Sequence, residues 1–241
     1  MLCKKHSYHI LDKRLKKQKN KKIISFCLYG LGSVRDKIRN YYDGIFVNYY
    51  LAKKIYPDWI CRVYIDYKVP KNKIDELFIL DDLEIIVVKT DIPFMCVRFL
   101  PFDDRDVDIW ISRDLDSIIR GREKQAVDEW LESDKSMHMM HDHKHHIDLV
   151  LGGMFGIKNK YVFDFIDFIN NYSYNYKKNY NINYGYDIAV LIEIFNKYYK
   201  NDYIQHYRGG YKHENSQPFK INGQFVGKAH NMKRIRNKMN F

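Results

Sequence analysis

The chain has 241 residues, a hydrophobic fraction of 46%, and 41 Lys and Arg against 30 Asp and Glu, so its formal net charge is +11. This length and composition exclude an intrinsically disordered chain and allow one large domain or two small ones. The longest apolar runs, at 23–29 and 149–157, are shorter than the roughly 18 residues that a membrane-spanning helix needs, so no transmembrane segment is predicted.

Short apolar runs alternate with amphipathic segments up to residue 132. Strands are predicted at 23–29, 59–66, 83–89 and 107–112. Helices are predicted at 39–56, 71–80, 94–100 and 122–132. This alternation is typical of a mostly parallel α/β sheet flanked by helices.

The second part of the chain has a less regular pattern. Strands are predicted at 137–141 and 149–157, and helices at 160–169 and 186–199. Residues 170–183 are rich in Asn, Tyr and Lys and offer no consistent apolar face, which predicts a surface loop.

The positive charge is concentrated at the two ends of the chain. Residues 1–22 contain nine Lys and Arg and one Asp, and residues 228–241 contain five Lys and Arg and no acid. The body at 23–227 has a net charge of −2. We therefore expect one near-neutral folded domain, preceded by a loosely held basic arm and followed by a basic tail. This distribution argues against nucleic-acid binding, which favours basic residues interleaved with aromatics across the folded body.

The four cysteines are not spaced as zinc ligands or as a disulfide framework. Cys27, Cys61 and Cys96 lie in apolar segments and are predicted to be buried free thiols of a reducing compartment. No apolar segment of signal-peptide length follows the N-terminal lysines. The sequence therefore favours a cytoplasmic location.

Two Asp-x-Asp pairs lie on either side of the strand predicted at 107–112. Ligands of open α/β sheets bind outside the carboxyl ends of the strands. Asp114 and Asp116 follow the strand and so lie at this ligand edge, where paired carboxylates suit a magnesium or manganese ion that also holds substrate phosphates. A turn with helix-capping acids is the alternative. Asp106 and Asp108 open the strand and are predicted to be solvated acids at the opposite edge.

Several short motifs occur in a specific combination. They are Arg98-Phe99-Leu100, Arg113-Asp114-Leu115-Asp116-Ser117, the segment 122–130, His141-Asp142-His143, Leu151-Gly152-Gly153-Met154-Phe155-Gly156, Tyr184-Gly185-Tyr186-Asp187 and Gln224-Phe225-Val226-Gly227. With these motifs the chain resembles a family of glycosyltransferases of bacteria and giant DNA viruses. The resemblance covers about residues 23–227 and implies a single GT-A (Rossmann-like) α/β domain. The chain departs from the family pattern at Ile119 and His141, where Arg is frequent, and at Ile188, where Gln is frequent.

The resemblance implies an enzyme that transfers a sugar from a nucleotide sugar, by default a UDP-sugar, to a glycan or other hydroxyl acceptor. It implies Mn²⁺ or Mg²⁺ as cofactor, bound directly by Asp116, with Asp114 contacting the ribose or reaching the metal through water. Such a metal neutralises the leaving diphosphate as the glycosidic bond breaks. Inversion and retention of the anomeric configuration both stay open.

Arg98 lies in the largely apolar segment 94–100, where an isolated arginine needs an acidic partner. We predict that it orients Asp114 or Asp116, or contacts the nucleotide of the donor. A structural ion pair with another acid is the alternative.

Two further positions have both a functional and a structural interpretation. Gly152 and Gly153 lie in an apolar run, where glycine lets a ligand or another backbone approach closely. In the family the equivalent strand faces the transferred sugar, and a bulge in a core strand is the alternative. Asp187 opens a predicted helix after Gly185, and is either the base that activates the acceptor hydroxyl or a helix cap.

Five of the ten histidines lie between residues 138 and 146, without further Cys or His spaced to complete a zinc site. Because the resemblance includes Asp142 and His143, we predict that they contact the sugar or the acceptor. His206 is the first candidate for a third metal ligand and His213 the second.

The aromatic residues give a weaker signal, because the chain contains 21 tyrosines. Tyr29, Tyr64 and Tyr211 are candidates for stacking on a uracil base, and we select Tyr29. Two alternative functions stay open: a nucleic-acid-binding protein or metal-dependent nuclease, and a GT-A-like scaffold without activity. The expected partners are a nucleotide sugar and its acceptor, with no nucleic acid and no prediction of oligomeric state.

Overall fold

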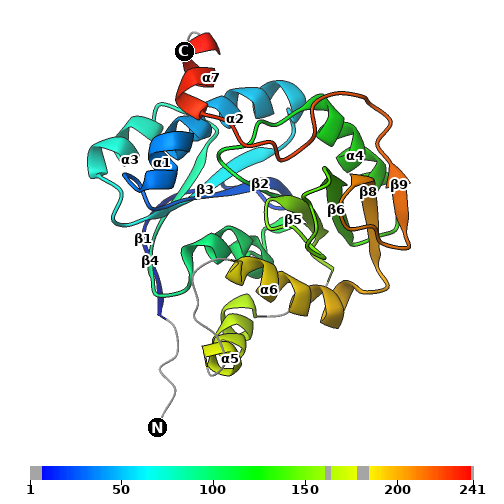
Figure 1. The fold of residues 1–241 in the computed structure, drawn as a ribbon. Coiled ribbons are helices and arrows are strands. Elements are labelled where there is room, and N and C mark those ends of the chain that lie inside the picture. The colour runs from blue at the N-terminus through cyan, green and yellow to red at the C-terminus, as the bar shows by residue number, and fades with distance from the viewer. Residues whose placement is uncertain (1–6, 161–163, 178–184, 240–241) are drawn as a thin grey trace.

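The fold is built on one twisted sheet with the strand order β1-β4-β3-β2-β5-β7-β6-β8-β9 (Figure 1). This computed structural model describes residues 7–160, 164–177 and 185–239. The strands are β1 (Tyr8–Arg14), β2 (Lys21–Leu28), β3 (Ile60–Asp66), β4 (Glu84–Thr90), β5 (Val107–Arg113), β6 (Met137–Asp142), β7 (Met154–Lys158), β8 (Tyr203–Gly209) and β9 (Ser216–Pro218). The helices are α1 (Val34–Arg39), α2 (Tyr41–Ile55), α3 (Lys71–Leu77), η1 (Phe94–Asp103), α4 (Gly121–Glu132), α5 (Phe165–Lys177), α6 (Tyr186–Ile194), η2 (Phe195–Tyr199) and α7 (Met232–Met239).

The centre of the sheet is parallel. β2 pairs in parallel with β3 on one side and with β5 on the other, and β3 continues in parallel to β4. β7 then pairs antiparallel to both β5 and β6, which makes the sheet mixed. The predicted fold, a single α/β domain with a mixed, mostly parallel sheet, is therefore confirmed.

Helices cover the sheet on both faces (Figure 1). One apolar core packs α2 and α3 against the sheet, and the other packs η1, α5 and α6 against its opposite face. β2 is buried on both sides, with Ile23 in one core and Ile24 in the other, because a central parallel strand has no solvent face. Cys27, Cys61 and Cys96 are buried free thiols, as predicted.

Several element boundaries differ from the sequence prediction. The helix expected at 39–56 is two helices, because Asn40 adopts a left-handed conformation with φ of 56° between α1 and α2. The loop expected at 170–183 is helical as far as Lys177, and its remainder, 178–183, lies outside the described residues. The strand expected at 149–157 begins only at Met154, because Gly152 and Gly153 lie in the preceding turn.

The described parts of both basic ends are docked, which corrects the prediction of a loosely held arm. β1 is an edge strand antiparallel to β4, and Arg14 donates hydrogen bonds to the carbonyls of Phe78 and Leu80 at 2.8 and 2.6 Å. At the other end Met232 is fully buried, and the guanidinium of Arg236 lies 3.6 Å from the ring centroid of Phe46 on α2. Arg14 and Arg236 thus each hold an end of the chain against a neighbouring element.

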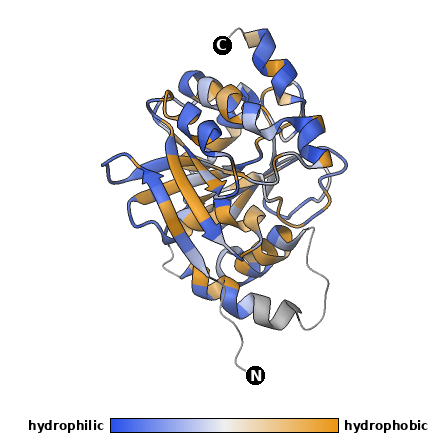
Figure 2. Ribbon diagram, turned by 90° about the vertical axis from the view of Figure 1, so that its left-hand side faces the viewer, coloured by the Kyte–Doolittle hydropathy of each residue, from blue (hydrophilic) through white to orange (hydrophobic). Residues whose placement is uncertain are grey.

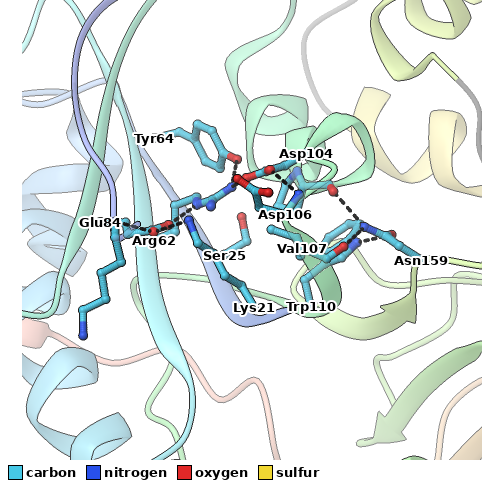
Figure 3. A network of polar contacts seen from close by, with 12 residues as sticks. Lys21, Ser25, Arg62, Tyr64, Glu84, Asp104, Asp106, Val107, Trp110 and Asn159 are labelled. Atoms are coloured by element: carbon cyan, nitrogen blue, oxygen red, sulfur yellow. Dashed lines mark hydrogen bonds and ion pairs between the residues drawn. The ribbon is translucent and has the colours of Figure 1, made fainter. Parts of the chain in front are cut away.

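A buried charge network joins the amino ends of the central strands (Figure 3). Arg62 donates to Glu84 at 2.6 Å and pairs with Asp104 at 2.7 Å, while Lys21 pairs with Glu84 at 2.9 Å. Asp104 also accepts the backbone N–H of Asp106 at 2.9 Å, so the first Asp-x-Asp pair lies at this edge of the sheet. Its side chains are exposed, as predicted.

The described helices include none that is long and apolar enough to cross a membrane.

Candidate active site

A cleft of about 400 Å³ opens at the carboxyl ends of β2 and β5. Its walls come from the segment after β2, from η1, from the turn after β5, from the turn before β7 and from the start of α6. Seven of the predicted site residues line it: Tyr29, Arg98, Asp114, Asp116, Gly152, Gly153 and Asp187. Residues separated by up to 158 positions thus meet at the sheet edge where open α/β folds bind ligands.

Arg98 joins two of the carboxylates across the cleft. One guanidinium nitrogen pairs with Asp114, and the other donates to Asp187 at 2.8 Å. The Arg98 side chain is almost fully buried, and its backbone carbonyl accepts the hydroxyl of Ser25 at 2.6 Å. Arg98 was predicted to need an acidic partner. It has two, Asp114 and Asp187, and both line the cleft.

The two glycines make room for these charges. A Cβ on Gly153 would lie 2.1 Å from an Asp114 oxygen, and a Cβ on Gly152 would lie 2.5 Å from both Arg98 and Asp187. The carbonyl of Gly152 accepts the hydroxyl of Ser112 at 2.6 Å, which holds the turn in place. The glycines are thus needed because polar side chains approach their backbone closely.

Asp114 and Asp116 differ in their surroundings. The side chain of Asp114 is 44% exposed, whereas Asp116 is buried, with Arg39 Nε 3.7 Å from one of its oxygens. Burial, together with the charge of Asp114, raises the pKa of Asp116 to about 6. This excess of negative charge fits a divalent cation, which would neutralise both groups.

The donor set also fits a hard cation of the magnesium type. Such ions are usually held by one or two carboxylates, with water and substrate phosphates completing the coordination. Among the residues that the structure describes, no group of three His, Cys, Asp or Glu is arranged to bind a metal. Asp114 and Asp116 would therefore hold the ion together with groups from the substrate.

Asp187 is the second residue of α6, whose N-cap is Gly185. Its carboxylate lines the cleft and pairs with Arg98. The N-cap position is thus occupied by Gly185, and the role of Asp187 as the base stays a prediction.

His206 lies away from the cleft, which corrects its prediction as a third metal ligand. It is fully buried on β8, where its ring contacts His138 at 2.8 Å and Gln217 at 2.7 Å. The second candidate, His213, bonds the carbonyl of Leu149 at 2.8 Å. Both rings are occupied by contacts inside the fold.

Asp142 and His143 are also outside the cleft lining, so their predicted sugar contacts have no support in the geometry. Arg122 holds the fully buried Asp142 through two hydrogen bonds of 2.8 and 2.7 Å. His143 stacks on Phe225 with a centroid distance of 4.3 Å. Asp142 and His143 are thus engaged in contacts within the fold.

The cleft includes residues that sequence reasoning missed or set aside. His145, which is exposed, and His146, which is half-buried, both line it. Ser33 and Arg35 line it from the segment after β2, and the glycine-rich run at 30–32 after a buried strand was the available signal. Of the other candidate tyrosines, Tyr64 is buried beside Arg62 and Tyr211 is not part of the lining.

Comparison with known proteins supports the fold. No family model matches the chain, and no curated protein matches its sequence. A solved 4-diphosphocytidyl-2C-methyl-D-erythritol synthase from Anaerococcus prevotii is 10% identical over 92% of this chain and 99% of its own, with a TM-score of 0.48. A protein assigned as a glucose-1-phosphate thymidylyltransferase from Bacillus anthracis, in complex with sucrose, is 11% identical over 91% of this chain and 94% of its own, with a TM-score of 0.51.

At these identities the likeness defines the fold class alone. The chain has the GT-A or nucleotidyltransferase-like fold, a single α/β domain with a mixed sheet flanked by helices.

Proposed function

We propose that the protein is a metal-dependent glycosyltransferase that moves a sugar from a nucleotide sugar, a UDP-sugar by preference, to a hydroxyl acceptor. The observation that carries this proposal is the convergence of Asp114, Asp116, Arg98 and Asp187 in one cleft at the carboxyl ends of β2 and β5. The resemblance of its motifs to GT-A glycosyltransferases agrees with that geometry.

On the donor side, Asp114 and Asp116 would hold Mn²⁺ or Mg²⁺. The ion would supply the charge neutralisation that a leaving diphosphate needs. Arg35 lines the cleft and adds a cation on the side of α1, where it can contact phosphate oxygens. Tyr29 is 36% exposed at the cleft wall and is the proposed stacking partner of the base.

On the acceptor side, Asp187 is the proposed base, because an inverting transfer needs one carboxylate near the acceptor hydroxyl. The guanidinium of Arg98 contacts both Asp187 and Asp114. It would therefore set the position of the acceptor-side carboxylate relative to the donor-side carboxylate. Gly152 and Gly153 let these charged side chains approach the backbone of the turn before β7.

The test is calorimetric binding of UDP-, GDP- and CMP-sugars with and without manganese. We expect one of these donors to bind only with manganese, and Asp116→Asn to abolish that binding while the melting temperature stays close to wild type. Asp106→Asn is the matched control, since it makes the same chemical change in the Asp-x-Asp pair at the opposite edge of the sheet. Binding of all donors without metal dependence would refute the proposal.

A second assay separates this function from the others that the fold and sequence leave open. The protein is incubated with a nucleoside triphosphate and a sugar 1-phosphate, and pyrophosphate is measured. Its release, abolished by Asp116→Asn, would identify a nucleotidyltransferase in place of a glycosyltransferase. Duplex DNA cleavage that depends on the same residue would identify a nuclease, and failure of every donor would leave an inactive scaffold.

A further inference from the structure

The helices α1 and α7 form one exposed surface at the mouth of the cleft, which we call the α1–α7 surface. It comprises the outward side chains of residues 34–39 and 228–239. The side-chain amide of Asn231 donates to the carbonyl of Ile38 at 2.8 Å, so the two segments meet where α1 ends and α7 begins. In Figure 1 α7 projects from the body beside α2, and Figure 2 shows that α7 is largely hydrophilic.

The α1 part of this surface exposes two aliphatic side chains. Val34 is 78% exposed and Ile38 is 57% exposed. They are four residues apart on a helix and therefore share one face. Lys37 is exposed beside them. Aliphatic side chains exposed between cations are the pattern of helices that lie at a membrane interface.

The α7 part supplies most of the charge. Residues 34–39 and 228–239 together contain eight Lys and Arg and one Asp. Within the described part of the chain, the exposed Lys233, Arg234 and Lys238 take part in no ion pair. The single acid, Asp36, is half-buried and accepts the backbone N–H of Gly32 at 2.9 Å.

The surface is held rigidly next to the cleft. Arg236 pairs with Asp43 of α2 at 3.0 Å, and Met232 is buried. Arg39, at the end of α1, lies 3.7 Å from Asp116, and the backbone N–H of His230 donates to the Asp116 carbonyl at 2.7 Å. A partner bound to this surface would therefore lie against the opening of the cleft.

We propose that the α1–α7 surface docks on an anionic lipid bilayer. Cations near such a surface are attracted by its negative potential, and Val34 and Ile38 gain free energy by entering the interfacial region. A nucleic acid would use the cations but would leave both aliphatic side chains in water, which favours the bilayer. If the proposed transfer reaction is correct, docking brings a lipid-borne hydroxyl acceptor to the cleft.

The experiment measures sedimentation of the full chain with phosphatidylcholine vesicles that contain 30% phosphatidylserine, and with pure phosphatidylcholine vesicles. Two variants test the surface: Val34→Ser/Ile38→Ser, and Lys233→Gln/Arg234→Gln/Lys238→Gln. Two matched controls lie elsewhere: Ile79→Ser, which changes another exposed isoleucine, and Lys13→Gln/Lys17→Gln/Lys19→Gln, which removes three cations near the N-terminus. All four variants change exposed side chains, and their melting temperatures verify the fold.

We expect binding to the anionic vesicles only, weakened by 0.5 M salt. Removing the three α7 cations should weaken binding about a hundredfold, from roughly a fivefold loss for each cation. The aliphatic double variant should weaken it about tenfold, and the controls should bind like wild type. Equal binding to neutral vesicles, loss of binding in the N-terminal control alone, or tighter binding to duplex DNA than to vesicles would overturn the proposal. Because no donor is present, the outcome is independent of the donor-binding test.

Discussion

Gly153→Ala is the substitution for which the structure makes the sharpest prediction. The new Cβ would lie 2.1 Å from an Asp114 oxygen, whereas ordinary contact begins at 3.4 Å. The Asp114 carboxylate must therefore retreat by about 1.3 Å, and a misplacement of about 1 Å at a reacting centre can cost about a hundredfold in rate. We expect kcat/KM with the best donor to fall about a hundredfold, which corresponds to about 2.7 kcal/mol.

The assay is manganese-dependent turnover of that donor, with the melting temperature measured in parallel. Gly153 does not have a positive φ, so alanine strains the backbone little, and the half-exposed Asp114 can swing into solvent. The melting temperature should therefore change by less than about 4 °C. Gly121→Ala is the matched control, since it also lacks a positive φ and its Cβ would meet no atom within 4 Å.

A second control separates loss of the site from loss of stability. A Cβ on Gly156 would lie 2.9 Å from both Ile111 and Trp130 in the core. Gly156→Ala should thus lower stability by about 1 to 3 kcal/mol, from overpacking, with kcat/KM near wild type at low temperature. The reasoning is refuted if Gly153→Ala keeps kcat/KM within threefold of wild type, or if it lowers stability as much as Gly156→Ala does.

Three further predictions concern the cleft, the pH and the C-terminal helix. Arg98→Lys keeps the charge but cannot contact both carboxylates at once, so steady-state turnover should fall about a hundredfold; unchanged kinetics would contradict the bridging role. Burial lowers the pKa of His138 and His206, so the unfolded chain binds more protons than the folded one below about pH 6.5. The melting temperature should therefore fall as the pH drops from 7.5 to 5, and a constant value would contradict this prediction. Arg236→Ala removes the cation from the ring of Phe46 and should cost about 1 to 2 kcal/mol in denaturant unfolding, with donor binding preserved.

The central strands and the placement of the carboxylates could be predicted because they follow from local patterns. An apolar run predicts the strand at 107–113. Residues that directly follow the carboxyl end of such a strand lie at the ligand edge of the sheet, independently of the rest of the chain. Asp114 was placed by that argument alone. Arg98 was predictable for a similar reason, because a cation in an apolar segment must find an acid.

The histidines and the chain ends could not be predicted, because their surroundings are set by residues far away in sequence. His206 is enclosed by His138 and Gln217, from other strands. The sequence of β1 is too polar for a strand to be predicted there. The strand is held in place by its pairing with β4 and by the hydrogen bonds that Arg14 donates to carbonyls near α3. The numbers of charged residues distinguish the chain ends from the body. They do not show which part of the fold a basic side chain will contact.

Ser25 and Ser112 are directly opposite each other in the register of β2 and β5. One hydroxyl holds the backbone of Arg98 and the other holds the backbone of Gly152, so two neighbouring parts of the cleft lining are fixed to the same residue pair of the sheet. The spacing between the Arg98 and Gly152 backbones is consequently set by the central strands β2 and β5. Such central strands are among the last parts of a fold to open. Variation in the peripheral helices can therefore alter what approaches the cleft while Arg98 and Gly152 keep their positions relative to each other.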